Sequence, residues 1–221
     1  MEPLVVKRAV LIADDHPVIR MGLKALLADC DDMECAGEAA DGHATIALTR
    51  RRDWDLLVMD LPMPGRNGLE LIKLVRCERP RLPIMVFTDQ REEMFAVRAI
   101  RAGAMGYIAK RAEAGKLLAA MRRVADGHVD ISDNVAELLA TDNSRDHADH
   151  LPHTRLTDRE FGIFARIVNG AKLTEIAGEL SLSIKTISTH KANILDKMTL
   201  TGQVQLVRYA IEHKLLDAAQ G

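Results

Sequence analysis

The chain has 221 residues, of which 48% are hydrophobic and 28% are charged, and its formal net charge is −2. This length allows one or two domains, and the composition is typical of soluble globular proteins. The charge gives no sign of nucleic-acid binding. One Trp, two Tyr and four Phe residues are too few for an RNA-binding surface based on aromatic stacking.

The sequence also argues against membrane insertion and secretion. No apolar run approaches the roughly 18–20 residues of a membrane span, and residues 1–16 reach paired acids too early for a signal peptide. Three cysteines, Cys30, Cys35 and Cys77, form no C-x-x-C pair. We therefore expect a cytoplasmic protein without membrane contact, whose thiols are reduced and mostly buried.

The first 127 residues alternate between short apolar runs typical of strands and amphipathic segments typical of helices. The predicted strands cover residues 8–13, 33–39, 54–60, 83–88 and 106–109. The predicted helices cover residues 17–27, 42–51, 68–77, 92–102 and 114–126, the first with an apolar stripe of Val18, Met21, Leu23, Leu26 and Leu27. This alternation predicts βαβ units and an α/β domain with a doubly wound, five-stranded parallel sheet.

The apolar pattern stops at the polar segment 141–154, which contains Pro152 and has the composition of a linker. Beyond it only helical patterns occur. The sequence thus predicts three parts: an α/β domain over 1–127, a connecting segment and linker over 128–154, and a small all-α domain over 155–217. His147, His150 and His153 in the linker have a spacing that a metal cluster could share, but solvated imidazoles are the commoner case.

Polar side chains follow four of the five predicted strands. Asp14 and Asp15 follow the first strand, Asp60 and Thr88 end the third and fourth, and Lys110 follows the fifth. Singly, each acid is typical of a solvated strand end. Together they favour one site, because the carboxyl ends of parallel strands meet at one edge of the sheet. Clustered carboxylates suit Mg²⁺, and an Asp beside Mg²⁺ can form an aspartyl phosphate.

These residues carry a resemblance to a known family. Residues 8–127 resemble the receiver domain of two-component response regulators, through Asp14-Asp15, Asp60 in MDLPMPGRNG, Thr88, and Lys110 in GYIAK. The block DDHPVIRMGLKALL resembles the NarL/FixJ branch. The resemblance implies a flavodoxin-like fold in which Asp60 accepts phosphate from a histidine kinase or phosphotransfer protein.

The resemblance also implies roles for the other strand-end residues. Mg²⁺ is expected at Asp14, Asp15, Asp60 and the carbonyl oxygen of Pro62. Thr88 and Lys110 would assist Asp60, and Thr88 and Tyr107 would form a switch pair. Such a domain promotes its own phosphorylation and dephosphorylation but is otherwise no enzyme.

Asp89 departs from the receiver pattern, because the family usually has a small residue after the switch threonine. A carboxylate near the entrance would repel a phosphodonor or an attacking water, which predicts altered phosphorylation or dephosphorylation kinetics. The alternative is that Asp89 simply points into solvent.

The helical region predicts a helix-turn-helix. Thr157 and Glu160 form the pattern of a capping box, and helices over 174–180 and 184–198 are joined by a tight turn. The segment from Leu156 to Met198 resembles the LuxR-type DNA-binding domain. By this resemblance the second of these helices reads promoter DNA as part of a homodimer, with RNA polymerase as a further partner. The expected DNA contacts are Lys185, Thr186, Ser188, Thr189, Lys191, Ala192 and Lys197.

Local charge agrees with weak binding by one monomer. Residues 155–214 hold nine basic and six acidic residues, and Thr174 and Ser188 stand where the family commonly has Lys. By the same resemblance, residues 202–213 form a last helix, whose apolar stripe serves the core and a dimer contact. Two other classes stay open: a Mg²⁺-dependent phosphatase with Asp60 as nucleophile, and an interaction module that seldom binds DNA. Pro62 argues against the phosphatase, since such enzymes usually carry a second acid there.

Overall fold

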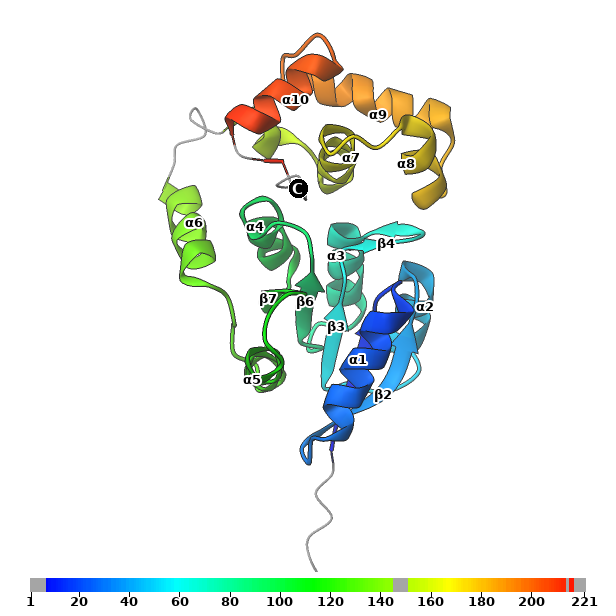
Figure 1. Cartoon of the computed structure of the whole chain (residues 1–221), viewed down its shortest axis with the longest axis vertical. Coiled ribbons are helices and arrows are strands. Elements are labelled where there is room, and N and C mark those ends of the chain that lie inside the picture. Colours follow the sequence, from blue (N-terminus) through cyan, green and yellow to red (C-terminus); the bar gives the residue numbers. More distant parts are fainter. Residues whose placement is uncertain (1–6, 145–150, 214, 217–221) are drawn as a thin grey trace, which may run out of the picture. The chain divides into compact units, whose positions relative to one another are not determined.

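The structure is a computed structural model in which residues 7–144, 151–213 and 215–216 are described. The chain forms two compact units, Met1–Asp133 and Asn134–Gly221. The first unit is an α/β domain and the second is helical (Figure 1).

The first unit contains the predicted parallel sheet. Its strands are β1 (Arg8–Ala13), β2 (Met33–Ala39), β3 (Leu56–Met59), β6 (Ile84–Thr88) and β7 (Gly106–Ala109), in the order β2-β1-β3-β6-β7. The helices between and after them are α1 (Pro17–Ala28), α2 (Gly42–Thr49), α3 (Gly68–Glu78), α4 (Glu92–Ala102) and α5 (Ala114–Ala125). The strand order reverses between β1 and β3, so the crevice at their carboxyl ends is the place where such sheets bind ligands.

Apolar side chains cover both faces of the sheet, which explains the continuous apolar runs of its strands. Val10 and Ile12 of β1 pack in one cluster with Leu27 of α1 and Met121 of α5, so these two helices share a face. Helices α2, α3 and α4 contact one another in a row and cover the opposite face. The backbone of the strand ends is therefore held from both sides.

The predicted apolar stripe of α1 is partly wrong. Leu23 and Leu27 are buried, but Val18 and Met21 are 77% and 68% exposed. Each residue of a helix advances about 100°, so Met21 lies roughly 200° from Leu23, on the opposite side of α1.

Two short features of the first unit were not predicted. Strands β4 (Pro62–Met63) and β5 (Arg66–Asn67) form a hairpin shortly after Asp60. Gly65 takes a φ of 83° in the turn of this hairpin. After α5, Asp130 forms a bridge with Gly106 at the edge of β7. Residues 128–132 therefore extend the first unit beyond the pattern that ends at residue 127.

The connecting segment contains a helix that was not predicted, α6 (Asp133–Ser144). Val135 is fully buried and Leu138 and Leu139 are half-buried, at the i, i+3, i+4 spacing of a helix. The polar residues that follow them hide this short apolar pattern in the sequence.

The second unit confirms the predicted helical domain. It comprises α6, the 3₁₀ turn η1 (Pro152–Arg155), α7 (Asp158–Val168), α8 (Leu173–Glu179), α9 (Ile184–Lys197) and α10 (Gln203–Glu212). Its fully buried side chains include Phe161, Phe164, Ile187, Ile194 and Leu206. Within the ranges that the structure describes, no helix is both long and apolar enough to cross a membrane.

All three cysteines are free, as expected, but their predicted burial is only partly correct. Cys30 is buried, Cys35 is half-buried and Cys77 is exposed on the last turn of α3.

Candidate functional site

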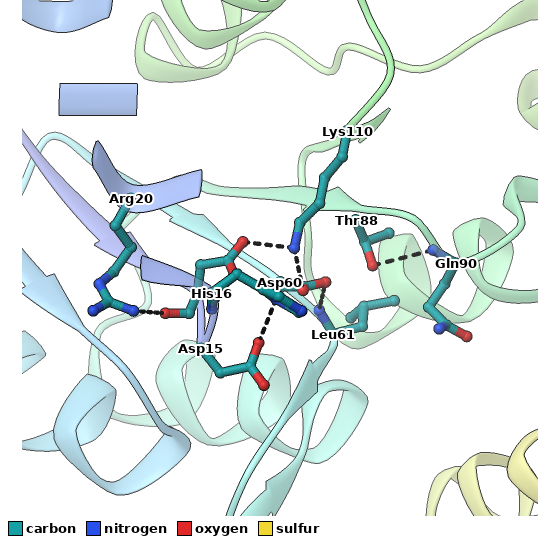
Figure 2. A network of polar contacts seen from close by, with 9 residues as sticks. Asp15, His16, Arg20, Asp60, Leu61, Thr88, Gln90 and Lys110 are labelled. Carbon is teal, nitrogen blue, oxygen red and sulfur yellow. Dashed lines mark hydrogen bonds and ion pairs between the residues drawn. The ribbon is translucent and has the colours of Figure 1, made fainter. Parts of the chain in front are cut away.

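The carboxyl ends of four strands bring the predicted polar residues together at one edge of the sheet. Asp14 follows β1, Asp60 follows β3, Thr88 ends β6 and Lys110 follows β7 (Figure 2). The parallel register aligns these ends, with Ala13 opposite Met59 on the neighbouring strand. Asp14, Asp60 and Thr88 are at most 2% exposed. Buried polar groups of this kind need partners, and the strand ends supply them.

Lys110 bridges the two buried carboxylates. Its Nζ lies 2.7 Å from Oδ2 of Asp14 and 2.5 Å from Oδ2 of Asp60. Burial raises the pKa of Asp60 and outweighs the hydrogen bonds from Lys110 and Thr88, which lower it. Burial alone would lower the pKa of Lys110, but its hydrogen bonds to the two carboxylates raise it above the ordinary value. The site therefore holds a charged ammonium beside a carboxylate that is unusually costly to ionise.

Two residues at the start of α1 hold the acidic pair, and neither was predicted to belong to the site. Arg20 Nη1 donates to the backbone carbonyl oxygen of Asp14 at 2.7 Å (Figure 2). The backbone N–H of His16 donates to Oδ1 of Asp14 at 2.9 Å, and the His16 Nδ1 atom lies 2.8 Å from Oδ1 of Asp15. Arg20 lies one turn into α1 and His16 directly precedes the helix, and this closeness to the acids in sequence was the one available signal.

The donor set fits a hard divalent cation. Single ligand atoms of Asp14, Asp15, His16 and Asp60 lie within 4.8 Å of one another. Three carboxylates face one Lys110 ammonium, so the cluster keeps an excess of negative charge that a cation would balance. Pro62 begins β4 two residues after Asp60, and proline retains the carbonyl oxygen that the predicted ligand set requires. Carboxylates combined with water suit Mg²⁺.

The two predicted switch residues are linked through a third. The backbone N–H of Gln90 donates to Oγ1 of Thr88 at 3.3 Å (Figure 2). The Tyr107 hydroxyl donates to the carbonyl oxygen of Gln90 at 2.9 Å. Tyr107 is 6% exposed. Gln90 was not predicted, because a backbone link of this kind leaves no sequence signal. Asp89, between Thr88 and Gln90, is exposed.

The predicted recognition helix presents most of its polar residues to solvent. Ser183 caps α9, because its hydroxyl accepts from the Thr186 N–H at 3.0 Å. Of the expected DNA contacts, Lys185, Ser188, Thr189 and Ala192 are exposed and Thr186, Lys191 and Lys197 are half-buried. On the opposite side of α9, Ile187, Ile194 and Met198 are buried, while Leu195 is half-buried.

Lys197 already has a partner within the domain. Its Nζ lies 2.7 Å from Oε2 of Glu160, which is 4% exposed. The same Oε2 accepts from the backbone N–H of Thr157 at 2.9 Å, which completes the predicted capping box of α7. This contact ties α9 to the start of α7, a role that the sequence pattern did not suggest.

One of the three linker histidines lies within the described residues. The His153 Nδ1 atom lies 2.8 Å from the Tyr209 hydroxyl of α10. His147 and His150 lie outside the described residues, so a metal cluster of the three stays untested.

Comparisons with known proteins agree with this geometry. The family profile of the response regulator receiver domain matches residues 10–122, and that of bacterial regulatory proteins of the luxR family matches residues 154–210. The response regulators GacA of Pseudomonas aeruginosa and UvrY of Escherichia coli K12 are 34% and 31% identical to this chain. Each alignment covers 95% of it and 98% or 96% of the relative.

Solved structures give the same result. RcsB from Salmonella enterica serovar Typhimurium, bound to promoter rprA with a phosphomimetic, is 26% identical with a TM-score of 0.66. The match covers 92% of this chain and 98% of that one. The fold and the strand-end site thus define a response regulator with a receiver domain and a LuxR-type DNA-binding domain. The chain belongs to the NarL/FixJ family of response regulators.

Proposed function

We propose that Asp60 accepts a phosphoryl group from a histidine kinase or phosphotransfer protein in the presence of Mg²⁺, and that this controls binding of a homodimer to promoter DNA. The observation that carries the proposal is Asp60 itself, buried to 1% exposure, held by Lys110 and surrounded by further carboxylates. A bound Mg²⁺ would neutralise charge on the transferring phosphoryl oxygens.

Protein side chains prepare Asp60 for the transfer. Its Oδ1 accepts from the backbone N–H of Leu61 at 2.7 Å, which fixes the orientation of the carboxylate. One carboxylate oxygen then forms the new O–P bond while the P–N bond of the donor phosphohistidine breaks, and the imidazole nitrogen keeps the electron pair. Asp14 and Asp15, with Asp60 and the Pro62 carbonyl oxygen, would hold the cation. Lys110, released from the carboxylates, would contact a phosphoryl oxygen.

Thr88 connects this chemistry to the surface of the domain. Its hydroxyl can donate to a phosphoryl oxygen on Asp60, and a movement of Thr88 toward that oxygen would lengthen its contact with the Gln90 N–H. The Gln90 carbonyl oxygen accepts from Tyr107, so a shift at Thr88 reaches Tyr107 through one backbone unit. Phosphorylation would thereby shift the population of receiver states.

The helical domain would bind DNA as a pair. Lys185 and the exposed hydroxyls of α9 suit phosphates and base edges in a major groove. Val204 and Ile211 of α10 are 82% and 60% exposed, and supply apolar surface for a second copy. Two helices in successive major grooves would bind DNA more tightly than one domain, whose basic excess is small. RNA polymerase is a further proposed partner. Binding to promoter DNA would require that the protein is in the cytoplasm.

A phosphotransfer assay tests the proposal. Incubation of the full chain with a phosphodonor and Mg²⁺ should label the parent protein and leave Asp60→Ala unlabelled, and EDTA should abolish labelling of the parent. Equal labelling of Asp60→Ala would refute the assignment. We propose no further enzymatic activity, so multiple turnovers of a phosphate monoester would instead favour a phosphatase.

A further inference from the structure

A cavity of about 430 Å³ opens at the end of β3 that lies away from Asp60. It is bounded by the ends of α2 and α3 and by the segments that lead into β3 and β6. Its lining consists of Thr49, Arg52, Asp53, Trp54, Glu78, Arg79, Pro80, Arg81 and Leu82. Because the full length of β3 separates it from Asp60, this cavity is distinct from the strand-end site.

The two acids at the cavity already have basic partners. Glu78 pairs with Arg50 through contacts of 2.7 and 2.5 Å, and Asp53 lies 3.3 Å from Nη1 of Arg79. The same network lowers the pKa of Glu78 through the hydrogen bond from Arg50. Among the described residues, Arg52 and Arg81 have no carboxylate partner. The cavity therefore carries an excess of positive charge that an anionic ligand would balance.

Arg52 is held in place without using its amino groups. Its Cζ lies 5.2 Å from the ring centroid of Trp54, and its Nε donates to the backbone carbonyl oxygen of Asp53 at 3.3 Å. Trp54 is itself fixed, because its Nε1 donates to the carbonyl oxygen of Leu48 at 2.9 Å. The guanidinium is thus ordered before any ligand arrives, which reduces the entropy cost of binding.

We propose that this cavity binds a small organic phosphate monoester. The phosphate would lie against Arg52 and Arg81, since guanidinium groups match phosphate oxygens in geometry and charge. The organic part would pack on the apolar wall of Trp54, Pro80 and Leu82. The cavity volume lies within the range of small-molecule sites, about 300–1,000 Å³. The proposal is independent of phosphorylation at Asp60.

The chain contains a built-in probe, because Trp54 is its only tryptophan. The full chain is titrated with adenosine monophosphate and, separately, with inorganic phosphate, in EDTA so that no divalent cation bridges the anion to the strand-end acids. We expect a saturable change in Trp54 fluorescence. Arg52→Ala and Arg81→Ala should each weaken binding about tenfold or more. Arg101→Ala, which removes an exposed arginine of α4, serves as the charge-matched control and should bind like the parent.

Equilibrium dialysis with labelled ligand repeats the comparison, because Arg52→Ala also alters the surroundings of Trp54. Thermal melts check that the variants are folded. Absence of saturable binding, or an equal loss in Arg101→Ala, overturns the proposal. Equal affinity for inorganic phosphate refutes the role of the apolar wall. A response to duplex DNA but to neither small ligand would mean that this surface binds nucleic acid instead.

Discussion

A lysine on α9 can contact DNA or form a structural ion pair, and a variant of Lys197 distinguishes these two roles. Its Nζ lies 2.7 Å from Glu160, a carboxylate that is 4% exposed, while the Lys197 side chain is 38% exposed. Removing one partner of a buried pair costs about 3–5 kcal/mol, and an exposed pair contributes about 0–1 kcal/mol. Thr157 still donates to Glu160 in the variant. We therefore expect Lys197→Ala to destabilise the helical unit by about 2 kcal/mol.

This loss should depend on pH. Burial raises the pKa of Glu160, but hydrogen bonds from Lys197 and Thr157 outweigh it and hold the pKa below its ordinary value. A lowered pKa in the folded state means that the pair stabilises the fold at neutral pH. The stabilisation is lost as the pH falls through the lowered pKa. The difference between the parent and Lys197→Ala should accordingly shrink in acid.

Hydrogen exchange of the α7 and α9 amides is the appropriate assay, because it reports the helical unit separately from the receiver unit. An opening free energy lower by about 2 kcal/mol makes exchange about thirtyfold faster. Lys185→Ala, on the exposed side of the same helix, is the matched control and should exchange like the parent. Unchanged exchange in Lys197→Ala, together with weaker DNA binding and a shallower salt dependence, would refute the structural role.

Three further predictions concern the strand-end site. Lys110→Ala leaves the buried carboxylates without their cation, so Mg²⁺ should raise its melting temperature more than that of the parent; an equal shift contradicts the bridging role. Asp89→Ala should change the rates of phosphotransfer or phosphate loss, and identical rates would mean that Asp89 only points into solvent. Gly68→Ala would place a Cβ 2.5 Å from the Leu61 carbonyl oxygen, so we expect slower phosphorylation of Asp60 and a lower melting temperature; parent-like values of both would show that this loop can move freely.

The strand-end site was predictable because its residues stand at fixed positions after apolar runs. Parallel strands buried on both faces leave an unmistakable pattern, and the carboxyl ends then place Asp14, Asp60, Thr88 and Lys110 at one edge. The role of Arg20 was not predicted, because its contact is with a backbone carbonyl oxygen. A long donor side chain at many other positions could reach such an oxygen.

Other features depended on packing that a linear pattern does not contain. The apolar residues of α6 are few and are followed by polar ones, so the helix resembles a linker in sequence. Val18 and Met21 match the spacing of a stripe only loosely, and the structure leaves them exposed. The pairing of Lys197 with Glu160 joins residues 37 positions apart, which no local spacing rule detects.

The proposed function requires that phosphorylation of Asp60 controls DNA binding. Its most direct test is a salt-controlled mobility shift assay on promoter DNA obtained by selection with this protein, comparing the parent and Asp60→Ala with and without a small phosphodonor and Mg²⁺. We predict that the phosphodonor tightens binding by the parent, with a shifted species containing two copies of the chain, and leaves Asp60→Ala unchanged. Equal binding by both proteins in all conditions, or no binding in any, would contradict control of DNA binding by phosphorylation of Asp60.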